Sequence, residues 1–199
     1  MPEKNEAIAI IGEAIKDCGS SCLIYRKKRQ RFDVESHQQI FYLIQGSVSV
    51  YRKSDDVLTN TVTGPAILGL LQMKMKEKTH YFRCDTDCEM WSLSIHDTNA
   101  IFNEKDLWGY AFDLLTHSIY QWYRRSNMIE QKDVYSIVVQ HLKYIWEMST
   151  ESRTQTSIYS FILRRSHISR SSIHKAICVL KEEGVVKVNR GKLLELSIK

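Results

Sequence analysis

The sequence lacks the segments that carry a protein into or across a membrane. It contains no run of about 18 apolar residues, which a transmembrane helix requires. Residues 1–6, MPEKNE, do not have the basic and then apolar layout of a secretory signal. These absences predict a cytoplasmic protein with no membrane partner.

The sequence also lacks the local motifs of common enzyme classes. It has no glycine-rich phosphate loop, no HExxH metal motif, no nucleophile elbow and no evident pair of catalytic carboxylates. We therefore expect no catalytic residues, no cofactor and no enzyme activity.

Cysteine is scarce, with five residues at Cys18, Cys22, Cys84, Cys88 and Cys178. An odd count in a cytoplasmic chain indicates reduced thiols. The first four could hold zinc or an iron–sulfur cluster, but each pair is separated by three residues where two are usual. Cys84 and Cys88 lie near strand segments at an even separation that suits one sheet face. Packing is the favoured role, redox sensing stays open, and no metal is assigned.

The positive charge is concentrated at the C-terminal end of the chain. The net charge is +5, yet residues 151–199 hold ten Lys or Arg against four Asp or Glu, while residues 1–150 hold 18 against 19. A basic segment of this kind is typical of contact with a polyanion such as DNA.

The first hundred residues predict one helix followed by an antiparallel β domain. Residues 3–18 form an amphipathic pattern with apolar residues at spacings of three and four, namely Ala7, Ile8, Ile11, Ala14 and Ile15. Short β-type runs follow at 22–25, 40–44, 47–51, 80–83 and 90–93. Turn residues at 45–46, 54–56 and 63–65 separate them, which favours a sandwich or barrel.

Helical periodicity returns in residues 96–126, with one apolar stripe made of Leu107, Tyr110, Ala111, Leu114, Leu115, Ile119 and Trp122. Although such a stripe often packs inside its own chain, we favour a two-fold dimer seam. A helix at 131–147 places His141 on an apolar face, as a core residue rather than a ligand. Residues 148–155 have no apolar period, and we expect a loop or turn.

Residues 157–183 have the pattern of a helix-turn-helix. Apolar residues at 158, 161 and 162 precede a break, and Ile173, Ala176, Ile177 and Leu180 follow it. Ser169 is the expected N-cap of the second helix. Two β runs at 185–188 and 193–196 then flank a basic turn at 189–192, which predicts a winged helix. A small α+β domain with no DNA-binding role is the alternative.

The exposed polar residues of this unit are the candidate DNA contacts. Arg170 can bind guanine O6 and N7 with two hydrogen bonds, and His174 can donate to a base acceptor. The serines at the start of this helix, Ser169, Ser171 and Ser172, and also Lys175 can contact phosphates or bases. The residues expected to bind backbone phosphates are Arg164, Arg165, Lys187, Arg190 and Lys192.

These patterns predict an α+β protein with three segments. Residues 1–100 form an antiparallel β-barrel of jelly-roll type, residues 101–127 a long dimerisation helix, and residues 128–199 a winged helix-turn-helix. Such a chain is expected to bind double-stranded DNA as a homodimer, because palindromic operators match protein two-fold symmetry.

Three segments resemble the CRP/FNR superfamily of transcription regulators. Residues 169–173, SRSSI, with 180–186, LKEEGVV, resemble its recognition helix and wing entry. Residues 41–50, FYLIQGSVSV, are similar to its strand-glycine-strand signature, and residues 84–90, CDTDCEM, to its late barrel strands. Nearly the whole chain is covered, and an enterobacterial IprA-type branch is indicated. The resemblance implies a cyclic-nucleotide-binding-like barrel and RNA polymerase as a further partner.

The sequence departs from the family where the family binds cyclic nucleotides. Leu68 and Gly69 occupy the positions of the family's Gly and Glu, and Lys78-Thr79 those of its Arg-Ser pair. Since the ribose acceptor is missing and Lys lacks the bidentate fork of Arg, we expect no dependence on cyclic AMP. A redox response, a non-standard small ligand, a nucleotide site with an altered cassette, and action through protein partners stay open. The aromatic residues available to a protein partner are Trp108, Tyr110, Phe112, Tyr120, Trp122 and Tyr123.

Overall fold

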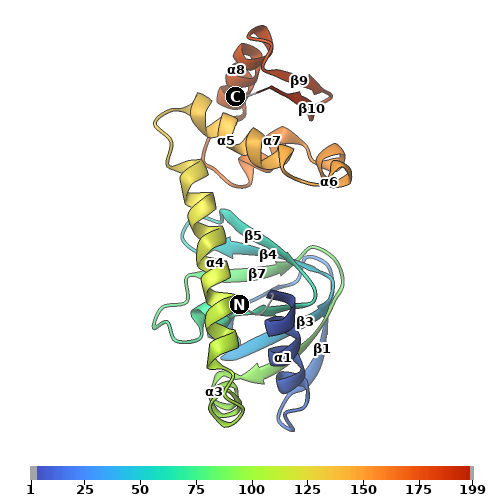
Figure 1. Cartoon of the computed structure of the whole chain (residues 1–199), viewed down its shortest axis with the longest axis vertical. Coiled ribbons are helices and arrows are strands. Elements are labelled where there is room, and N and C mark those ends of the chain that lie inside the picture. The colour runs from blue at the N-terminus through green and yellow to red at the C-terminus, as the bar shows by residue number, and fades with distance from the viewer. Residues whose placement is uncertain (1–3, 198–199) are drawn as a thin grey trace. The chain divides into compact units, whose positions relative to one another are not determined.

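The structure, a computed structural model, describes residues 4–197 and divides into two compact units, Met1–Trp122 and Tyr123–Lys199 (Figure 1). Residues 1–3 and 198–199 lie outside the described residues, and with them the start of the predicted opening helix. Helix α4 (Trp108–Ile129) contributes to both units. The finer division into three segments stays a prediction. Within the described residues, no helix has the length and apolar character needed to cross a bilayer.

The N-terminal unit is built on two four-stranded antiparallel sheets. The first has the order β1 (Cys22–Arg26), β8 (Cys88–Ser94), β3 (Gln39–Gln45) and β6 (Ala66–Leu68). The second has the order β2 (Arg31–Phe32), β7 (His80–Cys84), β4 (Ser47–Arg52) and β5 (Leu58–Thr63). The predicted α+β class is confirmed, although the sheets do not close into one barrel.

The two sheets enclose an apolar core that includes Phe41, Leu43, Phe82 and Met90. Strand β3 is buried on both faces, because Ile40 and Tyr42 point to the opposite side and pack in a second cluster. Burial of each large apolar side chain stabilises the fold by about 1.5–3 kcal/mol.

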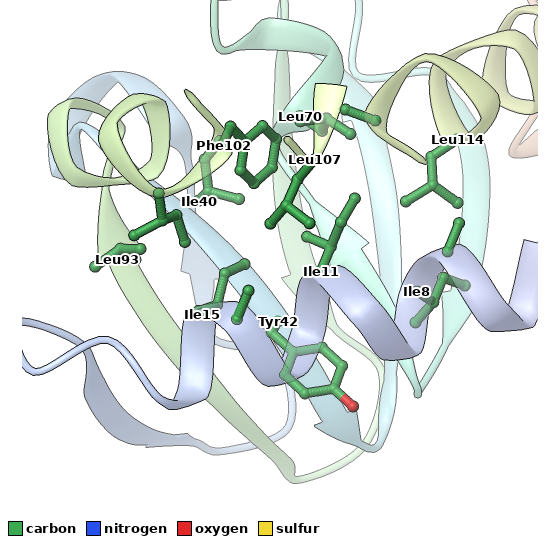
Figure 2. Close-up of a cluster of buried hydrophobic side chains, with 14 of the residues drawn as sticks. Ile8, Ile11, Ile15, Ile40, Tyr42, Leu70, Leu93, Phe102, Leu107 and Leu114 are labelled. Atoms are coloured by element: carbon green, nitrogen blue, oxygen red, sulfur yellow. The ribbon is translucent and has the colours of Figure 1, made fainter. Parts of the chain in front are cut away.

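Helix α1 (Lys4–Lys16) covers the outer face of the first sheet, as its apolar period predicts. Figure 2 shows Ile8, Ile11 and Ile15 directed from α1 into the second cluster, with Tyr42 beside the helix. A Cβ at Gly12 would lie 2.4 Å from the Tyr42 ring, so this close contact requires glycine.

The predicted helical stretch 96–126 consists of two helices, α3 (Ile95–Glu104) and α4, and the expectation of one continuous stretch is wrong. The chain breaks at Asp106, whose φ is 52°. The Leu107 N–H donates to Phe102 O at 2.9 Å. Leu107, Ala111 and Leu114 are buried in the core of the N-terminal unit, so the expectation that this part of the stripe forms a dimer seam is wrong.

Shorter elements of the N-terminal unit were not predicted from the sequence. They are strands β2, β5 and β6, helix α2 (Val34–His37) and the 3-10 turn η1 (Leu70–Gln72). Their polar composition or small size leaves little periodic signal.

The C-terminal unit packs four helices with a β-hairpin. The helices are α5 (Val134–Trp146), α6 (Thr150–Gln155), α7 (Ile158–Leu163) and α8 (Arg170–Glu182), and the hairpin strands are β9 (Val186–Asn189) and β10 (Lys192–Leu196). Their shared core contains Val138, Leu142, Ile162, Ile177 and Leu180.

Two predictions for this unit have clear outcomes. Residues 148–155 are not a loop, because Ser149 caps α6 by accepting a hydrogen bond from Ser152 N. This short helix has no buried residue and therefore no apolar period. His141 is a fully buried core residue, and its Nδ1 lies 2.8 Å from Ile137 O.

Candidate nucleic-acid interface

The first turn of α8 is fixed by the predicted serine cap. Ser169 Oγ accepts a hydrogen bond from Ser172 N at 3.1 Å, and it lies 2.9 Å from the hydroxyls of both Ser171 and Ser172. Capping by serine contributes about 1 kcal/mol to a helix. The cluster brings three of the predicted site residues together at the start of α8, where free backbone N–H groups favour an anion.

One face of α8 is buried and the opposite face carries the predicted base contacts. Ile173, Ala176, Ile177 and Leu180 lie in the core. Arg170, Ser171, His174 and Lys175 are all exposed. Because the helix has 3.6 residues per turn, the burial of one set orients the other outward, as a recognition helix requires.

Tyr159 in α7 contacts this exposed face and was not among the predicted site residues. The Arg170 guanidinium carbon lies 4.9 Å from the centroid of the Tyr159 ring. The Tyr159 hydroxyl lies 3.1 Å from His174 Nδ1, and Cys178 Sγ lies 3.6 Å from His174 Nε2. The sequence shows only a tyrosine beside the apolar Ile158, and this gives no signal of a contact with residues of the second helix.

The wing has a tight basic turn, as predicted. Arg190 and Gly191 both have positive φ, 46° and 75°, which is typical of a type I′ hairpin. Two of its lysines already have partners in the chain. Lys187 pairs with Glu195 at 2.6 Å across the hairpin, and Lys192 Nζ donates to Thr154 O at 2.5 Å.

The two arginines before the turn have different surroundings. Arg164 is exposed at the end of α7. The Arg165 guanidinium lies 3.8 Å from the centroid of the Phe161 ring and donates to Phe161 O at 3.4 Å. The Arg165 side chain therefore packs back against α7.

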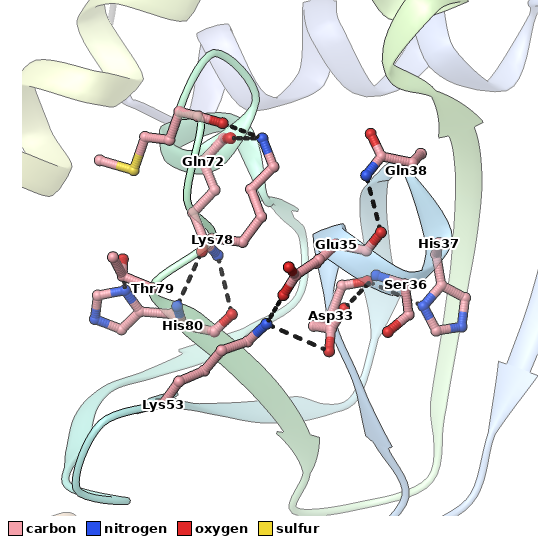
Figure 3. A network of polar contacts seen from close by, with 11 residues as sticks. Asp33, Glu35, Ser36, His37, Gln38, Lys53, Gln72, Lys78, Thr79 and His80 are labelled. Atoms are coloured by element: carbon pink, nitrogen blue, oxygen red, sulfur yellow. Dashed lines mark hydrogen bonds and ion pairs between the residues drawn. The ribbon is translucent and has the colours of Figure 1, made fainter.

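The region that aligns with the family's nucleotide cassette is occupied by contacts within the chain (Figure 3). Lys78 Nζ donates to Gln72 O at 2.8 Å and to Met75 O at 2.5 Å. The buried Gln72 side chain accepts from His80 N at 2.9 Å. The Lys78 ammonium is thus satisfied by backbone carbonyls, and Gly69 offers no side chain to hold a ribose.

Of the cysteines, Cys84 and Cys88 lie in the core between the sheets. They lie on β7 and β8, in different sheets, so the expectation of a shared sheet face is wrong. The turn at 85–87 carries the chain from one sheet to the other. Burial raises the pKa of the Cys84 thiol to about 12, with a smaller contribution from Cys88. Within residues 4–197, no group of three or more His, Cys, Asp or Glu side chains is placed to hold a metal ion.

Comparison with known proteins extends these observations to both units. Residues 134–199 match a family model described as winged helix-turn-helix DNA binding. The protein named "Inhibitor of hydrogen peroxide resistance" from Salmonella typhimurium is 26% identical over 164 residues, which span 82% of this chain and 79% of that protein. The protein of the same name from Escherichia coli K12 is 25% identical over 170 residues, 81% of this chain and 78% of that one.

Solved structures share the fold at low identity. The c-di-GMP-responsive global regulator CLP of Xanthomonas campestris is 16% identical, with a TM-score of 0.71 over 94% of this chain and 99% of that chain. A transcriptional regulator of the CRP/FNR family from Eubacterium rectale is 15% identical, with a TM-score of 0.67 over 98% of this chain and 94% of that chain. The fold is therefore shared along nearly the full length of the chain.

Proposed function

We propose that this chain regulates transcription as a homodimer on a palindromic operator. Its resemblance to CRP/FNR regulators and their IprA-type branch is confirmed, and its C-terminal unit contains a winged helix-turn-helix DNA-binding domain. The match to the winged helix-turn-helix model and the fold shared with solved regulators support this role. The observation that carries the proposal is the exposed polar face of α8, capped by Ser169 and opposite a buried apolar face.

The division of roles follows from exposure and chemistry. Arg170, Ser171, His174 and Lys175 read base edges in the major groove. Ser169 and Ser172 present their hydroxyls to a phosphate near the start of α8. The remaining phosphate contacts are Arg164, Lys187, Arg190 and Lys192. Arg165 reaches a phosphate only if its guanidinium leaves the Phe161 ring.

The proposed dimer seam is the exposed apolar side of α4, in place of the predicted stripe, whose first part is buried in its own chain. Phe112, Ile119 and Tyr123 recur at spacings of seven and four, which align them on one side of a helix, and Tyr120 and Trp122 flank them. These five side chains are 55–68% exposed within one chain. Contiguous exposed apolar surface of this kind marks an interaction site, and a second copy of α4 supplies an equally apolar surface.

The proposed regulator does not use cyclic AMP. Lys78 aligns with the family's phosphate-binding Arg, and its ammonium donates to carbonyls of its own chain. The names of the relatives associate them with hydrogen peroxide resistance, and we include peroxide-defence genes among the proposed targets. A direct thiol response centred on Cys84 is disfavoured, since a thiol with so high a pKa stays protonated and weakly nucleophilic. RNA polymerase is the further partner in this proposal.

Genome-wide mapping of bound DNA tests the proposal. The wild-type chain should give sharp peaks that share a palindrome, and Arg170→Ala and Lys175→Ala should lose them. Lys76→Ala is the matched control, because it removes one exposed positive charge from the N-terminal unit. Absence of enrichment with the wild-type chain would contradict the proposal and favour action through protein partners.

A further inference from the structure

We propose that Tyr159 is a positioning residue, which holds Arg170 and His174 in the geometry that reads DNA. This inference rests on the proposed function and adds a specificity determinant outside the recognition helix. Tyr159 lies in the first turn of α7, and its side chain is half-buried. It is therefore anchored by the fold while its ring and hydroxyl face two base-reading side chains.

The ring of Tyr159 joins α7 to the wing. Ile158 N donates to Gly191 O at 2.9 Å, which fixes the wing turn beside the start of α7. A Cβ at Gly191 would lie 3.6 Å from Cδ2 of Tyr159, so the ring lies beside the wing turn. The position of Tyr159 is thus set by three elements, α7, α8 and the wing.

The contact with Arg170 restricts a long and flexible side chain. With its guanidinium carbon 4.9 Å from the ring centroid, Arg170 is within the range of a cation–π interaction. Arginine loses rotamer freedom when it binds a base edge, and ordering it in advance reduces that cost. Tyr159 should therefore strengthen binding at the base that Arg170 reads.

The contact with His174 orients the imidazole. Its Nδ1 lies 3.1 Å from the Tyr159 hydroxyl and its Nε2 lies 3.6 Å from Cys178 Sγ. A histidine ring with partners at both nitrogens has a defined orientation, and the nitrogen that accepts from its partner leaves the other one protonated. Burial, with a smaller contribution from Cys178, raises the pKa of the Tyr159 phenol. The hydroxyl therefore keeps its proton at neutral pH and can donate it to Nδ1. Nε2 is then the protonated nitrogen, and it exchanges its 3.6 Å contact with Cys178 for a base acceptor.

The test uses the full chain and duplexes selected by the wild-type protein from a random-sequence library. Dissociation constants are measured for the selected duplex and a scrambled duplex with wild type, Tyr159→Leu and Tyr159→Phe. Tyr159→Leu should weaken the selected duplex about tenfold and the scrambled one less than twofold, as expected for loss of an ordered arginine contact. Tyr159→Phe keeps the ring beneath Arg170 and should recover most of the loss.

Two further measurements separate positioning from simple packing. Repeating the selection with Tyr159→Phe should relax the same base position as His174→Ala, because only the hydroxyl contact is removed. Thermal unfolding identifies any variant that fails to fold. The matched control is Tyr25→Leu, which makes the same substitution in the N-terminal unit, where Tyr25 is 69% exposed.

The possible outcomes are distinct. Equal losses on both duplexes, or unchanged binding to the selected duplex by Tyr159→Leu, would overturn the positioning role alone. If the wild-type chain selects no sequence, the proposed function itself fails and this inference fails with it.

Discussion

The chain contains two short basic segments that invite the same interpretation and differ in what their cations contact. In the segment around Lys78, the ammonium donates to two carbonyls of its own loop. In the first turns of α8, the charged side chains of Arg170 and Lys175 are exposed on the side opposite a buried apolar face. A positive residue predicts an anion site only where its N–H donors are still available. Its hydrogen-bond partners in the folded chain determine whether they are.

Replacing Arg170 is the strongest way to test this difference. We expect Arg170→Ala to weaken binding to the selected operator by about 1–3 kcal/mol, because a bidentate base contact is lost. Fluorescence anisotropy with operator and scrambled duplexes measures both affinities. An equal loss on the two duplexes would make Arg170 a phosphate contact, contrary to its proposed role.

Replacing Lys78 should have the opposite signature. Lys78→Met leaves the Gln72 and Met75 carbonyls without their donor, and we expect a loss of about 1–2 kcal/mol in the free energy of unfolding. Urea denaturation measures it, and operator affinity should stay within twofold. The control is Lys76→Met at an exposed position, which should change stability by less than about 0.5 kcal/mol. Unchanged stability in Lys78→Met would mean that the ammonium is available to a ligand, and the contrast with α8 would disappear.

Acid should add a charge at a buried position of the DNA-binding unit. Burial lowers the pKa of His141, and the guanidinium groups of Arg165 and Arg125 lower it further. Above about pH 6.5 the ring is neutral in both states. As pH falls, the unfolded chain takes a proton first, so stability falls by at most about 1.4 kcal/mol per pH unit until the folded pKa is reached.

The measurement is urea denaturation at about pH 7.5 and 5.5. His141→Leu should show a smaller loss between the two pH values than the wild type, and His96→Gln, at a highly exposed histidine, should match the wild type. If His141→Leu keeps the full acid sensitivity, another group is responsible.

Elements with a strong periodic signal could be predicted from the sequence, and contacts between elements could not. Helix α8 was predicted because a serine cap precedes four apolar residues at helical spacing. Helix α6 was missed because a short exposed helix buries nothing. Strand β5 was missed because most of its residues are polar.

The candidate site shows the same limit. The charges of Arg170 and Lys78 were both visible in the sequence, but their neighbours were not. Tyr159 reaches Arg170 and His174 only once α7 and α8 are packed, and the Lys78 carbonyls meet only once their loop is folded. Chemistry at a position could be predicted, whereas the availability of that chemistry depends on tertiary structure.

Lys192 combines features of Lys78 and of the exposed residues of α8, and its replacement has the smallest expected effect on DNA binding. Its ammonium donates to Thr154 O at 2.5 Å, as Lys78 donates to its loop, but it also flanks the wing turn near Arg190. If it contacts a phosphate, Lys192→Ala should weaken operator and scrambled duplexes alike, by about threefold, and lower the slope of log affinity against log salt by about 1. Lys76→Ala should leave that slope unchanged. If Lys192→Ala also leaves the salt slope unchanged, then Lys192, like Lys78, only stabilises the fold. The phosphate contacts of the wing are then Arg190 and Lys187.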